Sequence, residues 1–167
     1  PARAKRRPPD SGMTPPAERP DDPREPPGGS TGPPDRQTLR LLERQCATTP
    51  LVADTEFQPS ATEPRRLVAT FDTDAFPEPV ATARLDTRWF TTGDFSLHYV
   101  ETTTDGDHWE CRWDRHPNPH SARLHFHEPP DGTSVVDLSL KSTHPLDVYS
   151  TVVAAIQQRL ADHWDKP

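Results

Sequence analysis

The stretch FSLHYVETTTDGDHWECRWDRHPNPHSARLHFHE, residues 95–128, decides the fold because apolar and polar residues alternate through most of it. Alternation with a period of two is the pattern of strands that bury one face. It predicts three strands with apolar positions at Phe95, Leu97 and Tyr99, at Trp109, Cys111 and Trp113, and at Leu124 and Phe126. The first two strands are separated by Asp105-Gly106, which is typical of a tight hairpin turn.

The same alternation continues on both sides of this stretch. It predicts two earlier strands, one with Leu67, Ala69 and Phe71 and the other with Ala81, Ala83, Leu85, Thr87 and Trp89 on the buried face. Residues 135–140 favour either a sixth strand or an apolar approach to the last element. Residues 50–64 contain three prolines and predict a loop.

Two helices are expected beside these strands. Asp35 is a suitable N-cap, and Leu39, Leu42 and Cys46 follow at helical spacing. The segment from Pro145 to Trp164 carries a longer apolar stripe, with proline in its first turn. The order of elements predicts an α+β fold, an open antiparallel sheet of about four to six strands with the N-terminal and C-terminal helices on one face.

Residues 1–36 differ in composition from the rest of the chain. They hold eleven of the 22 prolines and four of the seven glycines, with seven Lys or Arg and six Asp or Glu. A segment with so few large apolar side chains cannot bury enough surface to offset the entropy lost on ordering. The sequence therefore predicts a disordered Pro-rich tail over residues 1–36 and a single α+β domain over residues 37–167.

The predicted domain is acidic, with twelve Lys or Arg against twenty Asp or Glu, a net charge of about −8. Only three of the chain's 19 basic residues are lysine. Such a surface favours a halophilic archaeon as the source, because net charge opposes association in concentrated salt. A GC-rich genome is the other explanation. The acidity argues against a broad basic face for duplex nucleic acid but leaves room for a local basic pocket.

The sequence favours a cytoplasmic protein. Cys46 and Cys111 are the only cysteines and form no CxxC pair, which is typical of a reducing compartment. No apolar run follows the basic residues Pro1–Arg7, and no stretch approaches the length of about 18 apolar residues that a membrane span requires. We expect neither a signal peptide nor a membrane anchor.

Period-two geometry predicts what lies on the sheet face turned away from the helices. That face would collect Arg84, Asp86, Arg88, His98, His108, Glu110, Arg112, Asp114, Arg123, His125 and His127. Seven of the eight histidines fall between His98 and His144, and His116 and His120 would lie in an adjoining loop. The alternative is a solvated face on which histidine replaces lysine.

Acid–base catalysis is the first interpretation of this face. One histidine can act as a base and another as an acid near neutral pH, while arginine stabilises a phosphorane-like transition state. These groups suffice to cleave RNA by its own 2′-hydroxyl, so no metal or cofactor is expected. The hypothesis assigns His125 and His127 as the acid–base pair, Arg112 to phosphate, and Asp114 and His98 to orienting their partners. The predicted substrate-binding residues are Arg115, His116, His120 and Arg123.

Two other interpretations remain open. The pair His125 and His127 on a strand, or His116 and His120 in the loop, can place imidazoles around one Zn²⁺ or related ion. Two prolines lie between His116 and His120, however, and no cysteine or glutamate spacing completes a recognisable closed site. The third interpretation is a non-catalytic interaction domain that binds a partner through the same polar face.

The stretch RWDRHPNPHSARLHFHEPPDG, residues 112–132, together with the preceding FSLHYVE, resembles the TumE-type family of small toxin–antitoxin components. Its members carry an H-Y strand, an R-Y-D-N-like strand, a histidine-containing loop, an H-x-H-like element and a C-terminal helix. The matching positions are His98, Tyr99, Arg112, Trp113, Asp114, His120, His125 and His127. The chain also resembles acidic haloarchaeal proteins that share the plan from Leu67 to Trp164.

The resemblance implies a role as well as a fold. It suggests growth inhibition by action on RNA, and neutralisation by a small antitoxin encoded alongside, often with a helix-turn-helix DNA-binding domain. The chain departs from the family pattern at Arg115, where asparagine is common, and at Pro119 and Phe126, which interrupt doubled histidines. An open sheet with a basic, histidine-bearing face is also similar to RelE-like ribonuclease toxins at the level of the fold.

Overall fold

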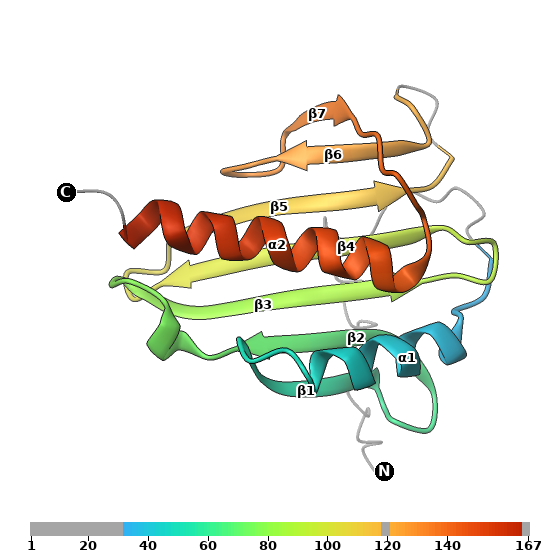
Figure 1. The fold of residues 1–167 in the computed structure, drawn as a ribbon, viewed down its shortest axis with the longest axis horizontal. Coiled ribbons are helices and arrows are strands. Elements are labelled where there is room, and N and C mark those ends of the chain that lie inside the picture. The colour runs from blue at the N-terminus through green and yellow to red at the C-terminus, as the bar shows by residue number, and fades with distance from the viewer. Residues whose placement is uncertain (1–31, 118–120, 165–167) are drawn as a thin grey trace, which may run out of the picture.

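The computed structural model describes residues 32–117 and 121–164, which form a seven-stranded antiparallel sheet and two α-helices (Figure 1). The elements are α1 (Arg36–Cys46), β1 (Val52–Pro59), β2 (Pro64–Phe71), a short 3-10 helix η1 (Thr73–Ala75), β3 (Val80–Trp89), β4 (Phe95–Thr103), β5 (His108–Arg115), β6 (Leu124–Glu128), β7 (Ser134–Asp137) and α2 (Pro145–Trp164). The strands lie in the sheet in the order in which they occur in the sequence. The predicted α+β fold with an open antiparallel sheet is confirmed, although the sheet has more strands than the four to six expected.

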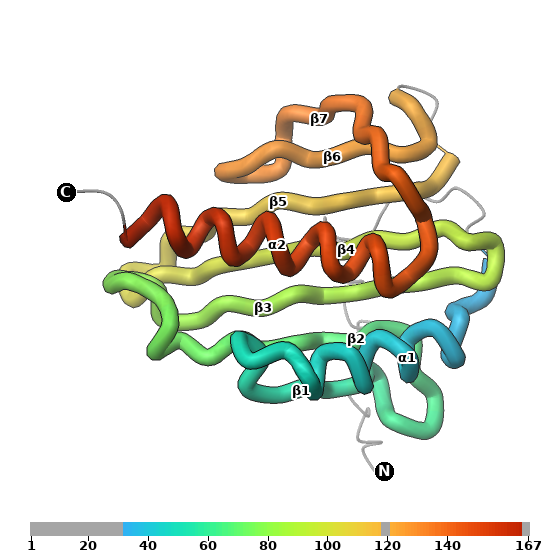
Figure 2. Tube along the Cα trace, viewed as in Figure 1, coloured from blue at the N-terminus to red at the C-terminus, as the bar shows by residue number. Residues whose placement is uncertain are grey.

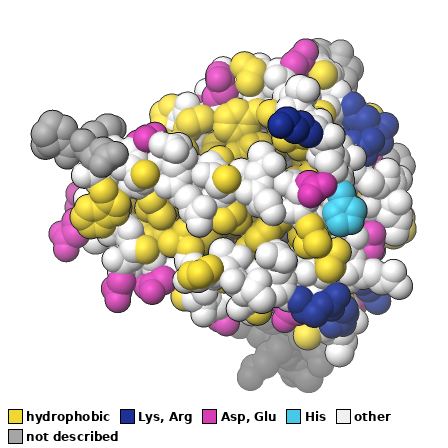
Figure 3. All heavy atoms as spheres, in the orientation of Figure 1, with side chains coloured by type: hydrophobic (Ala, Val, Ile, Leu, Met, Phe, Trp, Pro, Cys, Tyr) yellow, Lys and Arg dark blue, Asp and Glu magenta, His cyan; other side chains and the backbone are white. Residues whose placement is uncertain are grey.

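Both helices lie on the same face of the sheet, as predicted. The chain trace shows α1 over β2 and β3 and α2 across the middle of the sheet (Figure 2). The buried core between the layers includes Leu39 and Leu42 of α1, Val152 and Ile156 of α2, and Leu97 of β4. On this helix-bearing face apolar side chains show between the elements, and Lys and Arg are confined to a few places (Figure 3). The apolar half of each alternating strand therefore builds the core.

The strand β1 is an element that the sequence did not predict. It occupies part of the segment that its prolines marked as a loop, and it pairs with β2 from Val52 opposite Phe71 to Pro59 opposite Pro64. Proline cannot donate a ladder hydrogen bond, but it is tolerated at the end of an edge strand because no neighbour needs that donor. At the opposite edge, residues 134–137 form the short exposed strand β7, which resolves the choice left open for that segment.

The described residues begin at residue 32, within the segment predicted to be a tail. The Asp35 N–H donates to the Trp89 carbonyl at 2.8 Å, and the Thr91 N–H donates to the Pro33 carbonyl at 3.0 Å. The Asp35 carboxylate then accepts hydrogen bonds from the N–H groups of Gln37 and Thr38, so the predicted N-cap is confirmed. Residues 1–31 lie outside the described residues, and the division into a disordered tail and one domain stays a prediction.

The apolar stripe of α2 is buried against the sheet along most of its length. Six of its residues are buried, namely Val148, Tyr149, Val152, Val153, Ile156 and Leu160. Trp164, which the pattern included in the same stripe, is 62% exposed because the helix extends beyond the core at its last turn. Among the described residues no helix is both long and apolar enough to cross a membrane.

A buried ion pair attaches α2 to the sheet. Glu101 of β4 is almost fully buried and accepts hydrogen bonds from Arg159 Nε at 2.7 Å, Arg159 Nη2 at 2.5 Å and the Tyr99 hydroxyl at 2.8 Å. The Arg159 guanidinium also lies over the ring of Trp109, 3.3 Å from its centroid. The C-terminal half of α2 is therefore held over β4 and β5 by a bidentate charged contact as well as by apolar packing.

Replacing Arg159 with methionine should destabilise the protein strongly, because the Glu101 carboxylate would remain buried without its cation. We expect the free energy of unfolding from urea denaturation to fall by about 3 kcal/mol. The control is Arg65→Met, which removes an exposed ion pair with Glu63 and should cost less than about 1 kcal/mol. Equal losses in the two variants would contradict the assignment of Glu101–Arg159 as an anchor.

Candidate functional site

The strand register brings most of the predicted site residues onto the sheet face opposite the helices. Residues directly paired across antiparallel strands carry their side chains on the same face. Two neighbouring rows of paired residues cross this face, His98–Arg112–His127 and Ser96–Asp114–His125. The prediction that His98 shares a face with His125 is therefore confirmed.

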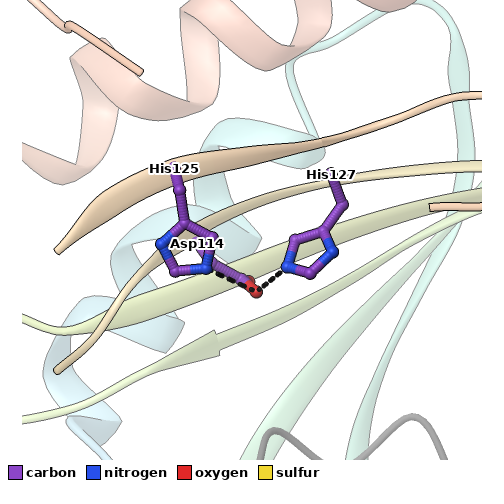
Figure 4. A group of neighbouring side chains, drawn as sticks. All are labelled: Asp114, His125 and His127. Carbon is purple, nitrogen blue, oxygen red and sulfur yellow. Dashed lines mark ion pairs between the residues drawn. The ribbon is translucent and has the colours of Figure 1, made fainter. Parts of the chain in front are cut away.

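Asp114 of β5 is the centre of this face, and its side chain has no exposed surface. Four groups approach one of its oxygens, Oδ2: Arg112 Nε at 2.7 Å, His127 Nε2 at 3.2 Å, His116 Nε2 at 3.6 Å and His125 Nε2 at 3.8 Å. Figure 4 shows Asp114 between the rings of His125 and His127. We call these five residues the Asp114 cluster.

Asp114 is ionised despite its burial. Burial is the largest influence and raises the pKa of its carboxyl group, but the contacts from His116 and His127 and the charge of Arg112 together outweigh it. They hold the Asp114 pKa well below its usual range. Burying an unpaired carboxylate lowers the stability of a protein by several kcal/mol. The groups around Asp114 are therefore needed to keep it buried and charged.

The three histidines of the cluster are each anchored through Nδ1 to a backbone carbonyl. The pairs are His116 with Pro117 at 3.0 Å, His125 with Ala122 at 3.0 Å, and His127 with Gly132 at 2.9 Å. A carbonyl oxygen can only accept, so Nδ1 carries the proton in each ring. Nε2, the other ring nitrogen, faces Asp114. It carries a lone pair when the ring is neutral and an N–H that can donate to the carboxylate when the ring is protonated.

His125 has no exposed surface, and its Nε2 has no hydrogen-bond partner among the described residues. Asp114 Oδ1, also buried, is unpartnered within the same part of the chain. Burial lowers the pKa of His125, although the Asp114 charge opposes it, and the neutral ring is favoured. A substrate cannot contact His125 in this conformation because the side chain is fully buried. Its assignment as an acid–base residue stays a prediction, and this burial argues against it.

Arg112 and His127 connect the cluster to the surface, with side chains that are 18% and 16% exposed. Arg112 Nη2 lies 2.9 Å from His127 Nε2 and donates to its lone pair. The guanidinium thus bridges His127 and Asp114. On the other side of Arg112 in the same row, His98 Nε2 lies 3.1 Å from Glu110 Oε2.

His98 is nearly buried, and burial is the largest cause that lowers the pKa of its imidazole. The charge of Arg112 acts in the same direction, while Glu110 raises the pKa of His98. The Glu110 carboxylate orients the His98 ring, and the predicted role of His98 in orienting its partners stays a prediction.

An arginine-lined pocket adjoins the Asp114 cluster. It is a small depression of about 20 Å³, room for about one water molecule, and is lined by Arg66, Asp86, Arg88, Ser96, His98 and Arg112. Asp86, which lies 3.6 Å from Arg66, is the acidic residue of this lining. The three arginines therefore give the pocket more positive than negative side chains. The sequence analysis missed Arg66, although the alternation that buries Leu67 also turns Arg66 to this face.

Two of the predicted substrate-binding residues are not brought to Asp114. Arg115 Nη1 lies 3.5 Å and Arg123 Nη2 lies 2.7 Å from Oδ1 of Asp94, a buried residue after β3. Arg115 pairs with Phe95 of the core, so its position in β5 belongs to the other face of the sheet from Asp114. Arg123 lies in the loop just before β6. Their role in substrate binding stays a prediction.

The two predicted loop histidines have different outcomes. His116 lies within the Asp114 cluster and is nearly buried, and Asp114 raises the pKa of its imidazole. It is therefore a partner of Asp114 and offers little surface to a substrate. His120 lies outside the described residues.

The family described as Toxin TumE matches residues 38–160 of this chain. The match runs from α1 to near the end of α2 and includes the Asp114 cluster and the pocket. Neither the curated proteins nor the solved structures contain a match.

Replacing Asp114 with asparagine should destabilise the domain, because Arg112 and the three imidazoles would lose their common anion. We expect the free energy of unfolding at pH 7, measured in buffer with EDTA, to fall by about 3 kcal/mol. Asp54→Asn removes an equal charge at an exposed position of β1 and should change stability by less than about 0.5 kcal/mol. A loss no greater than that of the control would show that the cluster does not depend on Asp114.

Proposed function

Since the chain belongs to the TumE toxin family, we propose that it is the toxin of a toxin–antitoxin pair and inhibits growth by acting on RNA in the cytoplasm. The observation that carries the proposal is the arginine-lined pocket beside the Asp114 cluster, in a chain whose net charge is −7. A local concentration of guanidinium groups on an acidic protein indicates a specific anionic substrate. The family implies an antitoxin partner, and we expect a small one with a helix-turn-helix domain.

The substrate is a single strand, bound through its phosphates. Arg66, Arg88 and Arg112 lie in the pocket wall, and a guanidinium can donate two parallel hydrogen bonds to one phosphate. Duplex binding requires many cations along a broad face, whereas the net charge of this chain is −7. Sequence-specific RNA recognition also mostly targets single-stranded regions, where bases are free to leave the stack.

His98 is the imidazole that lines the pocket and is the proposed general base. Its ring is oriented by Glu110 and kept neutral by burial, and it lies beside Arg112 in the same row of the sheet. In the proposed reaction His98 removes the proton of a 2′-hydroxyl, whose oxygen attacks the adjacent phosphorus. Arg112 stabilises the added negative charge, and the 5′-oxygen leaves as its bond to phosphorus breaks and takes a proton from water.

This assignment revises the pairing of His125 with His127. His125 has no surface to offer a substrate, whereas His98 lines the pocket. His127 does not line the pocket but is hydrogen-bonded to Arg112, which does. Asp114 accepts a hydrogen bond from Arg112 and so positions this arginine between His98 and His127.

Removing pocket cations should weaken RNA binding. We expect Arg66→Ala with Arg88→Ala to reduce affinity for a single-stranded RNA oligonucleotide by about 10-fold or more, and to lower the slope of log K against log salt by about 1. Fluorescence anisotropy over a salt series measures both quantities. The control is Arg40→Ala with Arg44→Ala on α1, exposed residues whose loss changes the net charge equally. Parallel losses in the two double variants would reject the pocket as the RNA site.

Replacing His98 with glutamine should abolish RNA cleavage while binding is retained. We expect a loss of about 100-fold or more in cleavage rate, and the loss of growth arrest on induced expression of the full chain. His108→Gln, at an exposed histidine of β5, should leave both unchanged. Growth arrest with intact RNA would instead favour the non-catalytic interaction domain, with the antitoxin or another protein as its partner.

A further inference from the structure

The ligand atoms of the Asp114 cluster are arranged as they would be around a metal ion. The Nε2 atoms of His127, His116 and His125 lie 3.2, 3.6 and 3.8 Å from Asp114 Oδ2. A tetrahedral ion with bonds of about 2.0 to 2.1 Å holds its ligand atoms about 3.3 Å apart. The ligand atoms of Asp114, His125 and His127 also all lie within 4.8 Å of one another. Where these separations exceed that distance, the side chains would have to move toward one another to close the site.

The hydrogen bonds behind these rings are those of metal-binding histidines. In each ring Nδ1 donates to a backbone carbonyl, which orients the ring so that Nε2 faces Asp114. The Nε2 lone pair of His127 accepts a hydrogen bond from Arg112. His125 Nε2 is fully buried, faces Asp114, and has no hydrogen-bond partner among the described residues. A buried acceptor without a donor is costly, and a cation between it and Asp114 would satisfy it.

We propose that Asp114, His125 and His127 bind one divalent transition-metal ion, with His116 placed to become a fourth ligand. Imidazole and carboxylate ligands suit Zn²⁺ and its first-row neighbours, and the spacing matches a tetrahedral site. Asp114 and His125 come from adjacent paired positions of β5 and β6, and His127 follows two residues later on the same face. The sheet therefore holds three ligands on one rigid surface.

Arg112 is the competing cation for this site. Its guanidinium bonds to Asp114 Oδ2 at 2.7 Å and to His127 Nε2 at 2.9 Å, the same two atoms that the ion would take. The side chain is partly exposed and lines the neighbouring pocket. Metal binding would therefore release Arg112 toward the pocket, where it is free to bind a phosphate. Ion and guanidinium are alternative partners of one pair of ligands.

Metal binding at the Asp114 cluster does not depend on the proposed action on RNA. A bound ion would add a second positive charge beside the phosphate pocket, but its presence is measured without RNA. Conversely, Arg66 and Arg88 lie outside the ligand set, so the double variant of these residues should bind metal normally. Loss of RNA binding and loss of metal binding are thus separable.

The experiment uses the full chain purified without a histidine tag and stripped with EDTA. We expect titration with ZnCl₂ to give one ion per chain by calorimetry and elemental analysis, and Co²⁺ to give the visible spectrum of a tetrahedral site. His125→Gln and His127→Gln should each weaken binding by about 100-fold or more, whereas His108→Gln should not change it. Absence of stoichiometric metal in the wild type, or binding that persists in the His125→Gln, His127→Gln double variant, would overturn the proposal.

Arg112→Met provides a test that a loss of folding cannot imitate. Because it removes the competing guanidinium, we expect this variant to bind Zn²⁺ about 10-fold or more tightly than the wild type, and Zn²⁺ to raise its melting temperature by more. Unchanged or weaker binding would show that Arg112 and the ion do not share their ligands. If neither the wild type nor Arg112→Met binds metal, Asp114 is paired with its own arginine and histidines, and the metal site does not exist.

Discussion

The buried charge of Asp114 is the constraint on which the polar face depends. A carboxylate without exposed surface requires cations or hydrogen-bond donors, and the residues around it are placed by the pairing of β4, β5 and β6. Arg112 reaches it from its own strand, His125 from the neighbouring one, and His116 from the end of β5. The cluster therefore follows from one charge and one register, which explains why so many imidazoles converge on this face.

The opposite face supplies the rigidity that this arrangement needs. The helices bury the apolar half of each alternating strand, and the contact of Arg159 with Glu101 holds α2 over β4 and β5. Strands packed in this way keep neighbouring side chains in fixed rows, so that the pocket and the cluster retain their relative positions. A site built on strands is also more precisely positioned than one built on loops.

Arg112 connects the two parts of the site. It lies between a pocket lined by other arginines and a set of histidines that it joins to Asp114. It also lies beside His98 in the same row of paired residues, so one side chain contacts the Asp114 cluster, lines the pocket and neighbours the imidazole that we propose as the base. In the proposals above, Arg112 either bonds to Asp114 and His127 or, when an ion takes those ligands, binds a phosphate in the pocket. These two positions of Arg112 relate the proposed action on RNA to the proposed metal site.

The amino-acid sequence by itself determined the two helices, the two faces of the sheet and the TumE family, because these depend on periodicity and on motifs that are local along the chain. It identified His98, Arg112, Asp114, His125 and His127 as residues of one face for the same reason. Tertiary structure alone decided the edge strand β1, the burial of His125, and the pairing of Arg115 and Arg123 with Asp94. Each of these features depends on strand register, on which strand lies at the edge of the sheet, or on contacts between residues far apart in the sequence. A local sequence pattern contains no information about such contacts.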